Sequence, residues 1–142
     1  MKSALHLFAQ ADSIIAALER GEMPGEVPSE LEPLFSPSLQ PYLVAWFRYD
    51  PVAELAAFEG PALVVQGTTD LQVTVADAEM LAEARPGVDY VPIDGMNHVL
   101  KPVAGGLAEQ APSYSDPSLP LAPGLAEAVA GFVRAVAERA AG

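Results

Sequence analysis

Two stretches decide the fold of this chain: PALVVQGTTD at positions 61–70 and VDYVPIDGMNH at positions 88–98. Each begins with an apolar run of β-forming residues and continues into a polar turn that contains a glycine. A group capable of proton transfer follows each glycine, Asp70 in the first stretch and His98 in the second. The run at positions 62–65 is continuously apolar, which is typical of a parallel strand covered on both faces.

The residues between the two stretches have the signature of a helix over positions 74–85. Thr74-x-x-Asp77 matches a capping box, and the sequence RPG that follows is typical of a helix end. The inner stripe of this helix is expected to contain Val75, Ala76, Met80, Leu81 and Ala84. The sequence therefore predicts a βαβ unit with Asp70 and His98 at the same ends of neighbouring parallel strands.

The remaining segments alternate between helices and loops. Helices are expected at positions 3–20, 42–49, 50–58 and 125–142, and loops at positions 22–41 and 99–123. The first loop contains five prolines, so we expect single turns there at most. The short, aromatic segment at positions 42–49 is expected to be one or two turns of buried helix.

Composition narrows the class of protein. The chain has 142 residues, 51% of them hydrophobic, which predicts one domain with its own core. Nineteen acidic and seven basic residues give a net charge of −12, which argues against nucleic acid or an anionic membrane as a partner. The absence of cysteine excludes disulfides and thiolate metal sites, and cytoplasm is the default location. Neither a signal peptide nor a membrane-spanning apolar run is recognisable.

The predicted sheet is small for a parallel one. Parallel strands normally occur in sheets of several strands, with helices on both faces. This sequence supplies two strands. We therefore expect the chain to form one side of a larger α/β sheet.

The motifs GTTD at positions 67–70 and GMNH at positions 95–98 resemble the C-terminal part of the serine α/β-hydrolases, with the esterase and aminopeptidase-like enzymes as the closest sub-type. In that superfamily the serine comes first along the chain, then the acid, then the histidine. The resemblance implies that Asp70 is the catalytic acid and His98 the catalytic base. It also implies an α/β fold in which two parallel strands and a crossover helix are flanked by lid-type helices and a C-terminal helix.

The resemblance further implies how the single domain is organised. Residues 1–60 are similar to the lid region and to the helix that leads into the acid-bearing strand. Residues 61–142 carry the βαβ unit, a loop and the final helix. The implied reaction is hydrolysis of a small ester or amide by an activated serine, with no cofactor and no metal.

The chain departs from the family at the nucleophile. It contains no G-x-S-x-G motif, the turn that carries the catalytic serine. None of its eight serines lies between a strand and a helix with flanking glycines, and Ser115 beside Asp116 lacks strand support. We therefore expect the missing motif to lie N-terminal of Met1, and the chain alone to be inactive.

Alternative interpretations exist for the chain and for its residues. The chain is alternatively a non-catalytic module that associates with a second copy or with another chain through strand edges and apolar surface. Asp70 and His98 are then ordinary polar residues of turns. Asn97 is expected to hydrogen-bond within its loop, and His6 to be a surface or lid residue. The aromatic residues at positions 42–49 are expected in the core, with an acyl pocket under a lid as the alternative.

Overall fold

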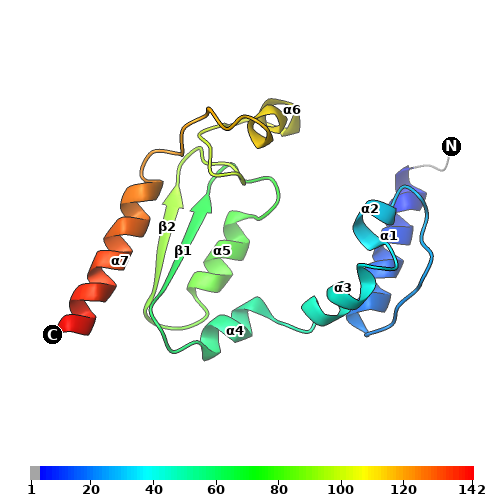
Figure 1. Cartoon of the computed structure of the whole chain (residues 1–142), viewed down its shortest axis with the longest axis horizontal. Coiled ribbons are helices and arrows are strands. Elements are labelled where there is room, and N and C mark those ends of the chain that lie inside the picture. The colour runs from blue at the N-terminus through cyan, green and yellow to red at the C-terminus, as the bar shows by residue number, and fades with distance from the viewer. Residues whose placement is uncertain (1–3) are drawn as a thin grey trace. The chain divides into compact units, whose positions relative to one another are not determined.

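The computed structural model describes residues 4–142 and divides into two compact units, with the boundary between Asp50 and Pro51. In chain order the elements are α1 (Ala4–Glu19), α2 (Glu32–Phe35), α3 (Gln40–Trp46), α4 (Pro51–Ala57), β1 (Ala62–Gly67), α5 (Val75–Ala82), β2 (Val88–Ile93), α6 (Leu107–Gln110), the 3-10 helix η1 (Ala111–Tyr114) and α7 (Leu125–Ala141) (Figure 1). Position 3, where the first predicted helix begins, lies outside the described residues. Among residues 4–142, no helix has both the length and the hydrophobicity needed to cross a bilayer.

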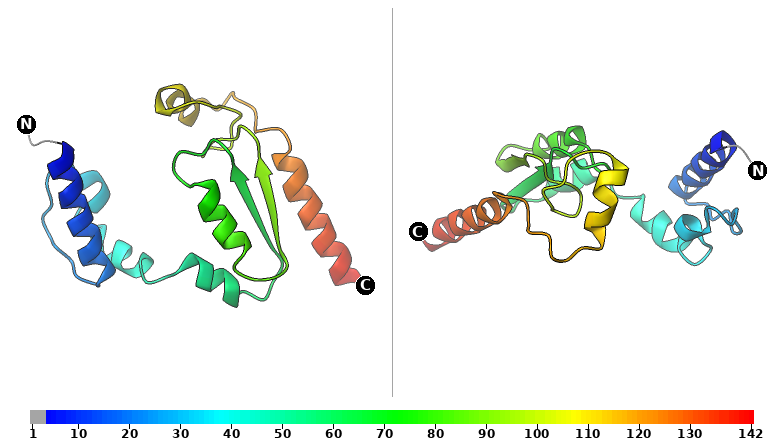
Figure 2. Two further views of the ribbon diagram at one scale, coloured as in Figure 1. Left: turned by 180° about the vertical axis from the view of Figure 1, so that it is seen from behind. Right: turned by 90° about the horizontal axis from the view of Figure 1, so that it is seen from above.

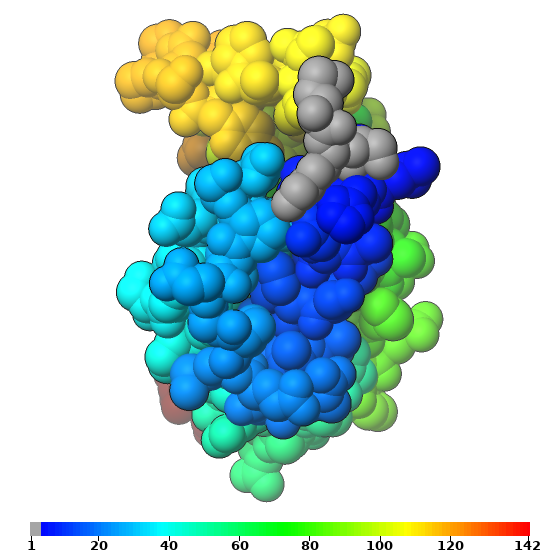
Figure 3. Space-filling model, turned by 90° about the vertical axis from the view of Figure 1, so that its right-hand side faces the viewer, coloured from blue at the N-terminus to red at the C-terminus, as the bar shows by residue number. Residues whose placement is uncertain are grey.

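The first unit contains α1, α2 and α3 around a small apolar core. Apolar residues recur at helical spacing in α1, so Ile14 and Leu18 pack together with Phe35 of α2. Helix α1 and the loop that follows it lie side by side on one face of this unit (Figure 3). The side chain of Gln40, which is 1% exposed, holds this loop because it hydrogen-bonds both backbone groups of Gly25.

The predicted burial of the aromatic segment is wrong for three of its four aromatic residues and holds for Phe47, which packs against the core. Tyr42, Trp46 and Tyr49 are 62%, 58% and 63% exposed. Leu43 and Phe47 pack against the core instead. Positions three or four apart share one face of a helix, so Tyr42 and Trp46 lie together on the outer face of α3, with their ring centroids 5.9 Å apart.

The second unit is a βαβ unit built on a two-stranded parallel sheet (Figure 1). β1 and β2 pair in register from Ala62↔Val88 to Gly67↔Ile93. Helix α5 connects the strands on one side of the sheet, and α7 lies on the other side (Figure 2). Both strands lie where the sequence predicts them. The mixed, parallel architecture is compatible with the predicted α/β class.

Helix α5 begins at the predicted capping box. The amide of Asp77 donates to Oγ1 of Thr74 at 3.2 Å, and the amide of Thr74 donates to Oδ2 of Asp77 at 2.8 Å. The predicted inner stripe is wrong in part, because Ala78 is the buried residue and Ala76 and Met80 are exposed. Ala78 is 1% exposed, and α5 contacts both strands.

The segment between β2 and α7 is more ordered than the loop predicted from its Gly, Pro and Ser content. Helices α6 and η1 follow each other over positions 107–114, and Gln110 and Ser113 are only 1% and 4% exposed. Helices of a single turn have no apolar periodicity that a sequence reading can detect. We refer to residues 103–114 as the bridging segment.

Helix α7 has the predicted position but leaves much of its apolar stripe uncovered. Val129 and Val133 are 44% and 57% exposed. A groove of about 320 Å³ beside the helix is lined by Pro61, Phe132, Val133, Val136, Ala137 and Ala140. Among the described residues, β1 pairs with β2 alone, so its other edge is also open.

A glycine permits the close contact that joins the ends of the two strands. At Gly67, the last residue of β1, an added Cβ would lie 2.0 Å from the carbonyl oxygen of Met96. That carbonyl accepts a hydrogen bond from the amide of Thr69 at 3.2 Å. Gly95 provides the turn before Met96 with a backbone φ of +67°, a conformation that favours glycine. The turn after β2 therefore lies directly on the turn after β1.

We expect Gly67→Ala to destabilise the chain by about 3 kcal/mol, because the methyl group would overlap a backbone carbonyl that has no room to move. Unfolding in urea, followed by circular dichroism, measures the change. Gly131→Ala in α7 is the control, since nothing lies within 4 Å of the added Cβ and alanine favours a helix. Equal stability of the Gly67→Ala variant and the wild type would contradict the close approach.

Candidate active site

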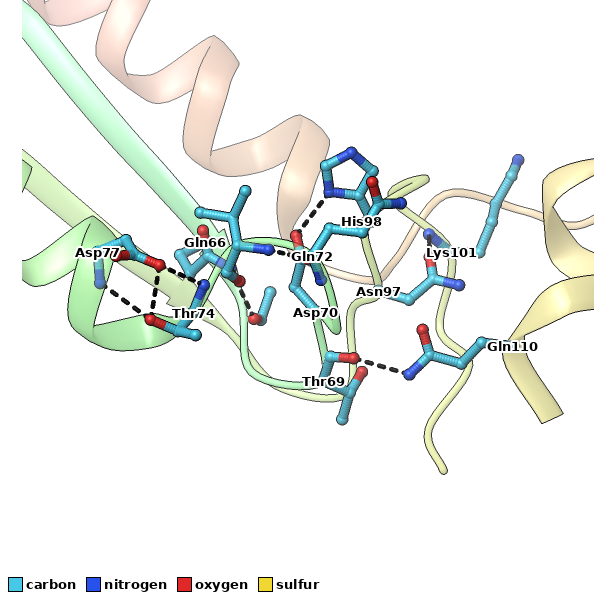
Figure 4. A network of polar contacts seen from close by, with 12 residues as sticks. Gln66, Thr69, Asp70, Gln72, Thr74, Asp77, Asn97, His98, Lys101 and Gln110 are labelled. Carbon is cyan, nitrogen blue, oxygen red and sulfur yellow. Dashed lines mark hydrogen bonds and ion pairs between the residues drawn. The ribbon is translucent and has the colours of Figure 1, made fainter. Parts of the chain in front are cut away.

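The structure brings Asp70 and His98 together. Asp70 lies in the turn after β1, and His98 lies in the turn after β2, at the carboxyl ends of the two parallel strands. The imidazole Nδ1 of His98 is 3.0 Å from Oδ2 of Asp70 (Figure 4). The predicted juxtaposition is present, and it follows from the register of the strands.

Asp70 is held as an ionised acceptor. Its side chain is 9% exposed, and its Oδ1 accepts hydrogen bonds from the amides of Gln72 at 2.8 Å and Val73 at 3.0 Å. Burial raises the pKa of Asp70, whereas the two backbone donors and His98 lower it. The hydrogen bonds prevail, and the pKa lies below its ordinary value of 3.8.

The same contact fixes the proton on the His98 ring. A carboxylate only accepts hydrogen bonds, so Nδ1 of a neutral His98 carries the hydrogen and Nε2 has the free lone pair. The His98 side chain is 37% exposed. Within residues 4–142, nothing is hydrogen-bonded to Nε2. The ring is therefore oriented and ready to accept a proton at Nε2.

The turn that carries His98 is anchored from inside by Asn97, which is 1% exposed. Its Oδ1 accepts from the amide of Lys101 at 3.0 Å, and its Nδ2 donates to Oγ of Ser113 at 2.8 Å. Leu100 closes the turn with a φ of +65°, which a non-glycine residue rarely adopts. Asn97 thus hydrogen-bonds within its loop, as predicted, and also reaches the bridging segment.

The turn that carries Asp70 is anchored to the same segment. Nε2 of Gln110 donates to the carbonyl of Thr69 at 2.7 Å (Figure 4). Oγ1 of Thr69 donates to the carbonyl of Val103 at 3.2 Å, and Nε2 of Gln72 donates to Oη of Tyr114 at 2.7 Å. Sequence reasoning missed Gln110 and Ser113, because contacts between distant segments leave no local pattern.

An apolar groove lies between the Asp70 turn and the bridging segment. It has a volume of about 400 Å³ and is lined by Leu71, Gln72, Leu107, Ala111 and Tyr114. Two of its lining residues, Leu71 and Gln72, directly follow Asp70 in the chain. No charged side chain lines it, so it suits an uncharged, apolar group.

Serine hydroxyls in the described part of the chain are engaged away from His98. Those of Ser13, Ser113 and Ser115 contact backbone carbonyls, those of Ser29 and Ser118 contact carboxylates, and Ser36 and Ser38 contact each other. Asp116 accepts hydrogen bonds from Ser118 and not from Ser115. Ser115 and Asp116 therefore do not form a nucleophile–acid pair. Ser3 lies outside the described residues.

Residues typical of a metal site do not gather in the described chain. Among residues 4–142 there is no group of three or more His, Asp or Glu side chains that could hold a metal ion. His6 lies in α1, in the first unit. The titratable pair that the structure brings together is the carboxylate of Asp70 and the imidazole of His98.

The chain was also compared with known proteins. No protein-family model, no curated protein and no solved structure matches it. The resemblance to serine hydrolases thus remains a prediction from the two motifs.

The lowered pKa of Asp70 predicts a specific loss of stability in acid. The unfolded chain binds the proton more tightly than the folded chain, so the stability due to ionised Asp70 is present above the ordinary pKa of 3.8 and disappears as pH falls through the folded value. We expect Asp70→Asn to flatten the dependence of unfolding free energy on pH below about 4.

Carbon-13 NMR titration of the Asp70 carboxyl tests the same point directly. We expect a midpoint below 3.8 in the wild type. In His98→Ala we expect a higher midpoint, because one of the lowering contacts is lost and the two backbone donors stay. A wild-type midpoint at or above the ordinary value would overturn this account of the acid.

Proposed function

We propose that this chain is the acid- and base-bearing C-terminal portion of a serine α/β-hydrolase. The observation that carries the proposal is the Asp70–His98 contact at the ends of neighbouring parallel strands, with Nε2 of the histidine free. Two further features support it: the sheet has an open edge at β1, and the helix α5 crosses between the strands in the order that the family requires. The proposal includes the assignment of the α/β unit to the C-terminal part of an α/β-hydrolase fold.

The proposed reaction is acyl transfer from an ester or amide to water. Nε2 of His98 takes the proton from a serine hydroxyl as the serine oxygen attacks the carbonyl carbon, and then gives that proton to the leaving group. A water molecule, deprotonated in the same way, releases the acid product and regenerates the serine. Asp70 keeps Nδ1–H oriented and stabilises the imidazolium that forms. The groove at Leu71 would receive an apolar part of the substrate.

The nucleophile must come from sequence outside these 142 residues. The described serines donate to other groups, and the chain lacks the G-x-S-x-G motif. A segment with that motif, on the same polypeptide or on a second one, would pair with the open edge of β1 and place its serine beside Nε2. Donors for the oxyanion would arrive with the same segment.

We expect the chain alone to hydrolyse p-nitrophenyl acetate no faster than its His98→Ala variant, because Nε2 has no serine to deprotonate. Loss of the nucleophile from such a unit costs on the order of 10⁶ in turnover. A fluorophosphonate, which labels activated serines, should add no mass to the intact chain. Turnover that requires His98 together with a labelled serine would falsify the proposal of a missing nucleophile.

We expect activity when a segment that carries the G-x-S-x-G motif is fused to the chain or mixed with it. In that enzyme Asp70→Asn should lower turnover by up to about 10⁴-fold, because the histidine loses its preferred tautomer. Asp94→Asn, a matched change in the turn before His98, should have little effect. Equal losses in the two variants would show that Asp70 does not act as the catalytic acid.

A second candidate function is association, which the exposed apolar stripe of α7 and the open edge of β1 favour. A second copy or a complementing chain would cover Val129 and Val133. We expect light scattering to give a mass above the 14.8 kDa of one chain. Lysine at both positions should restore the single-chain mass. A monodisperse single chain of high thermal stability would count against this candidate.

A further inference from the structure

Three buried polar residues behind the candidate dyad are linked by hydrogen bonds, with the backbone of Gln110 forming one of the links. Asn97, which precedes His98, donates from Nδ2 to Oγ of Ser113 at 2.8 Å. The hydroxyl of Ser113 donates to the backbone carbonyl of Gln110, three residues earlier, at 2.6 Å. Nε2 of Gln110 donates to the carbonyl of Thr69, which precedes Asp70, at 2.7 Å. Together with the Asp70–His98 contact, these bonds form a closed hydrogen-bond network that links the two turns.

The three side chains of this hydrogen-bond network are almost fully buried. Asn97 and Gln110 are each 1% exposed, and Ser113 is 4% exposed. Buried polar groups are costly unless they are hydrogen-bonded, so the amide groups of Asn97 and Gln110 and the hydroxyl of Ser113 favour the positions in which these bonds form. Gln110 also donates to the carbonyl of Gly105 at 2.9 Å, which fixes the bridging segment itself.

Asp70 and His98 are joined through only one direct side-chain contact, and the His98 ring is partly exposed. The backbone of the histidine turn is held by hydrogen bonds of the Asn97 side chain and backbone to Lys101 and Leu100. Loss of the hydrogen bond between Asn97 and Ser113 would remove the link between the His98 turn and the bridging segment.

We propose that Ser113 is a positioning residue: through Asn97 on one side and Gln110 on the other, it sets the placement of His98 against Asp70. Its hydroxyl accepts from the side chain of Asn97, which anchors the His98 turn, and donates to the backbone of Gln110, whose side chain anchors the Asp70 turn. This role deepens the proposed hydrolase function and rests on it for its catalytic meaning. The geometric claim is tested without catalysis.

The test uses NMR on the full chain, with two readouts at the dyad: the proton resonance of the His98 Nδ1–H and the titration midpoint of the Asp70 carboxyl. In Ser113→Ala we expect the hydrogen-bonded Nδ1–H resonance to broaden or disappear. We expect the Asp70 midpoint to move upward, toward that of His98→Ala. Ser115→Ala is the matched control, because its hydroxyl is exposed and makes only a long contact to the carbonyl of Pro112.

Ser113→Cys is the second variant, because a thiol nearly keeps the shape of serine but forms weaker hydrogen bonds. It should move both readouts in the same direction and by less, and it decides the question if Ser113→Ala does not fold. Wild-type readouts in a folded Ser113→Ala or Ser113→Cys variant would overturn the proposal, as would equal changes in Ser115→Ala. An inactive complemented enzyme with shifted readouts would instead contradict only the hydrolase function.

Discussion

The site depends on the parallel register of β1 and β2. Gly67 and Ile93 are partners in the sheet, so the chain leaves both strands at the same level. The absence of a side chain at Gly67 then lets the carbonyl of Met96 approach the first turn and accept from the amide of Thr69. Asp70 and His98 each follow one of these strands by a few residues, so their side chains lie close together. The Asp70–His98 contact is therefore a consequence of backbone geometry as much as of side-chain attraction.

The parts predicted correctly from sequence are those with local signals. Both strands follow from apolar runs that end at glycine, and α5 follows from the capping box at Thr74. The meeting of Asp70 and His98 follows from parallel pairing, since the carboxyl ends of parallel strands share one edge. The bridging segment could not be predicted, because Gln110 and Ser113 are buried by contacts with turns far away in the chain. The aromatic residues of α3 were misplaced because composition does not tell which face of a short helix is covered.

The two members of the dyad have different environments, and the difference suits different roles. Asp70 is shielded, and both of its carboxylate oxygens have donors, so it stays ionised and in place. His98 is more exposed and is bonded through one nitrogen, which leaves the other available. A general base needs an accessible lone pair, and the residue that orients it needs a fixed charge. The structure thus places the fixed charge inside and the accessible base outside.

The polar interior of the site makes its hydrogen bonds within the second unit, whereas the apolar surface of that unit is left uncovered. Behind the dyad, polar groups are joined by hydrogen bonds that start and end within the unit, so the turns can hold their geometry without a partner. At β1 and α7, by contrast, an open strand edge and exposed valines are left uncovered. Apolar burial of about 25 cal/mol per Å² would favour association there, and strand pairing would satisfy the free backbone groups. In the proposed enzyme, a partner that supplies the nucleophile binds at the sheet while Asp70 and His98 keep the arrangement that they already have.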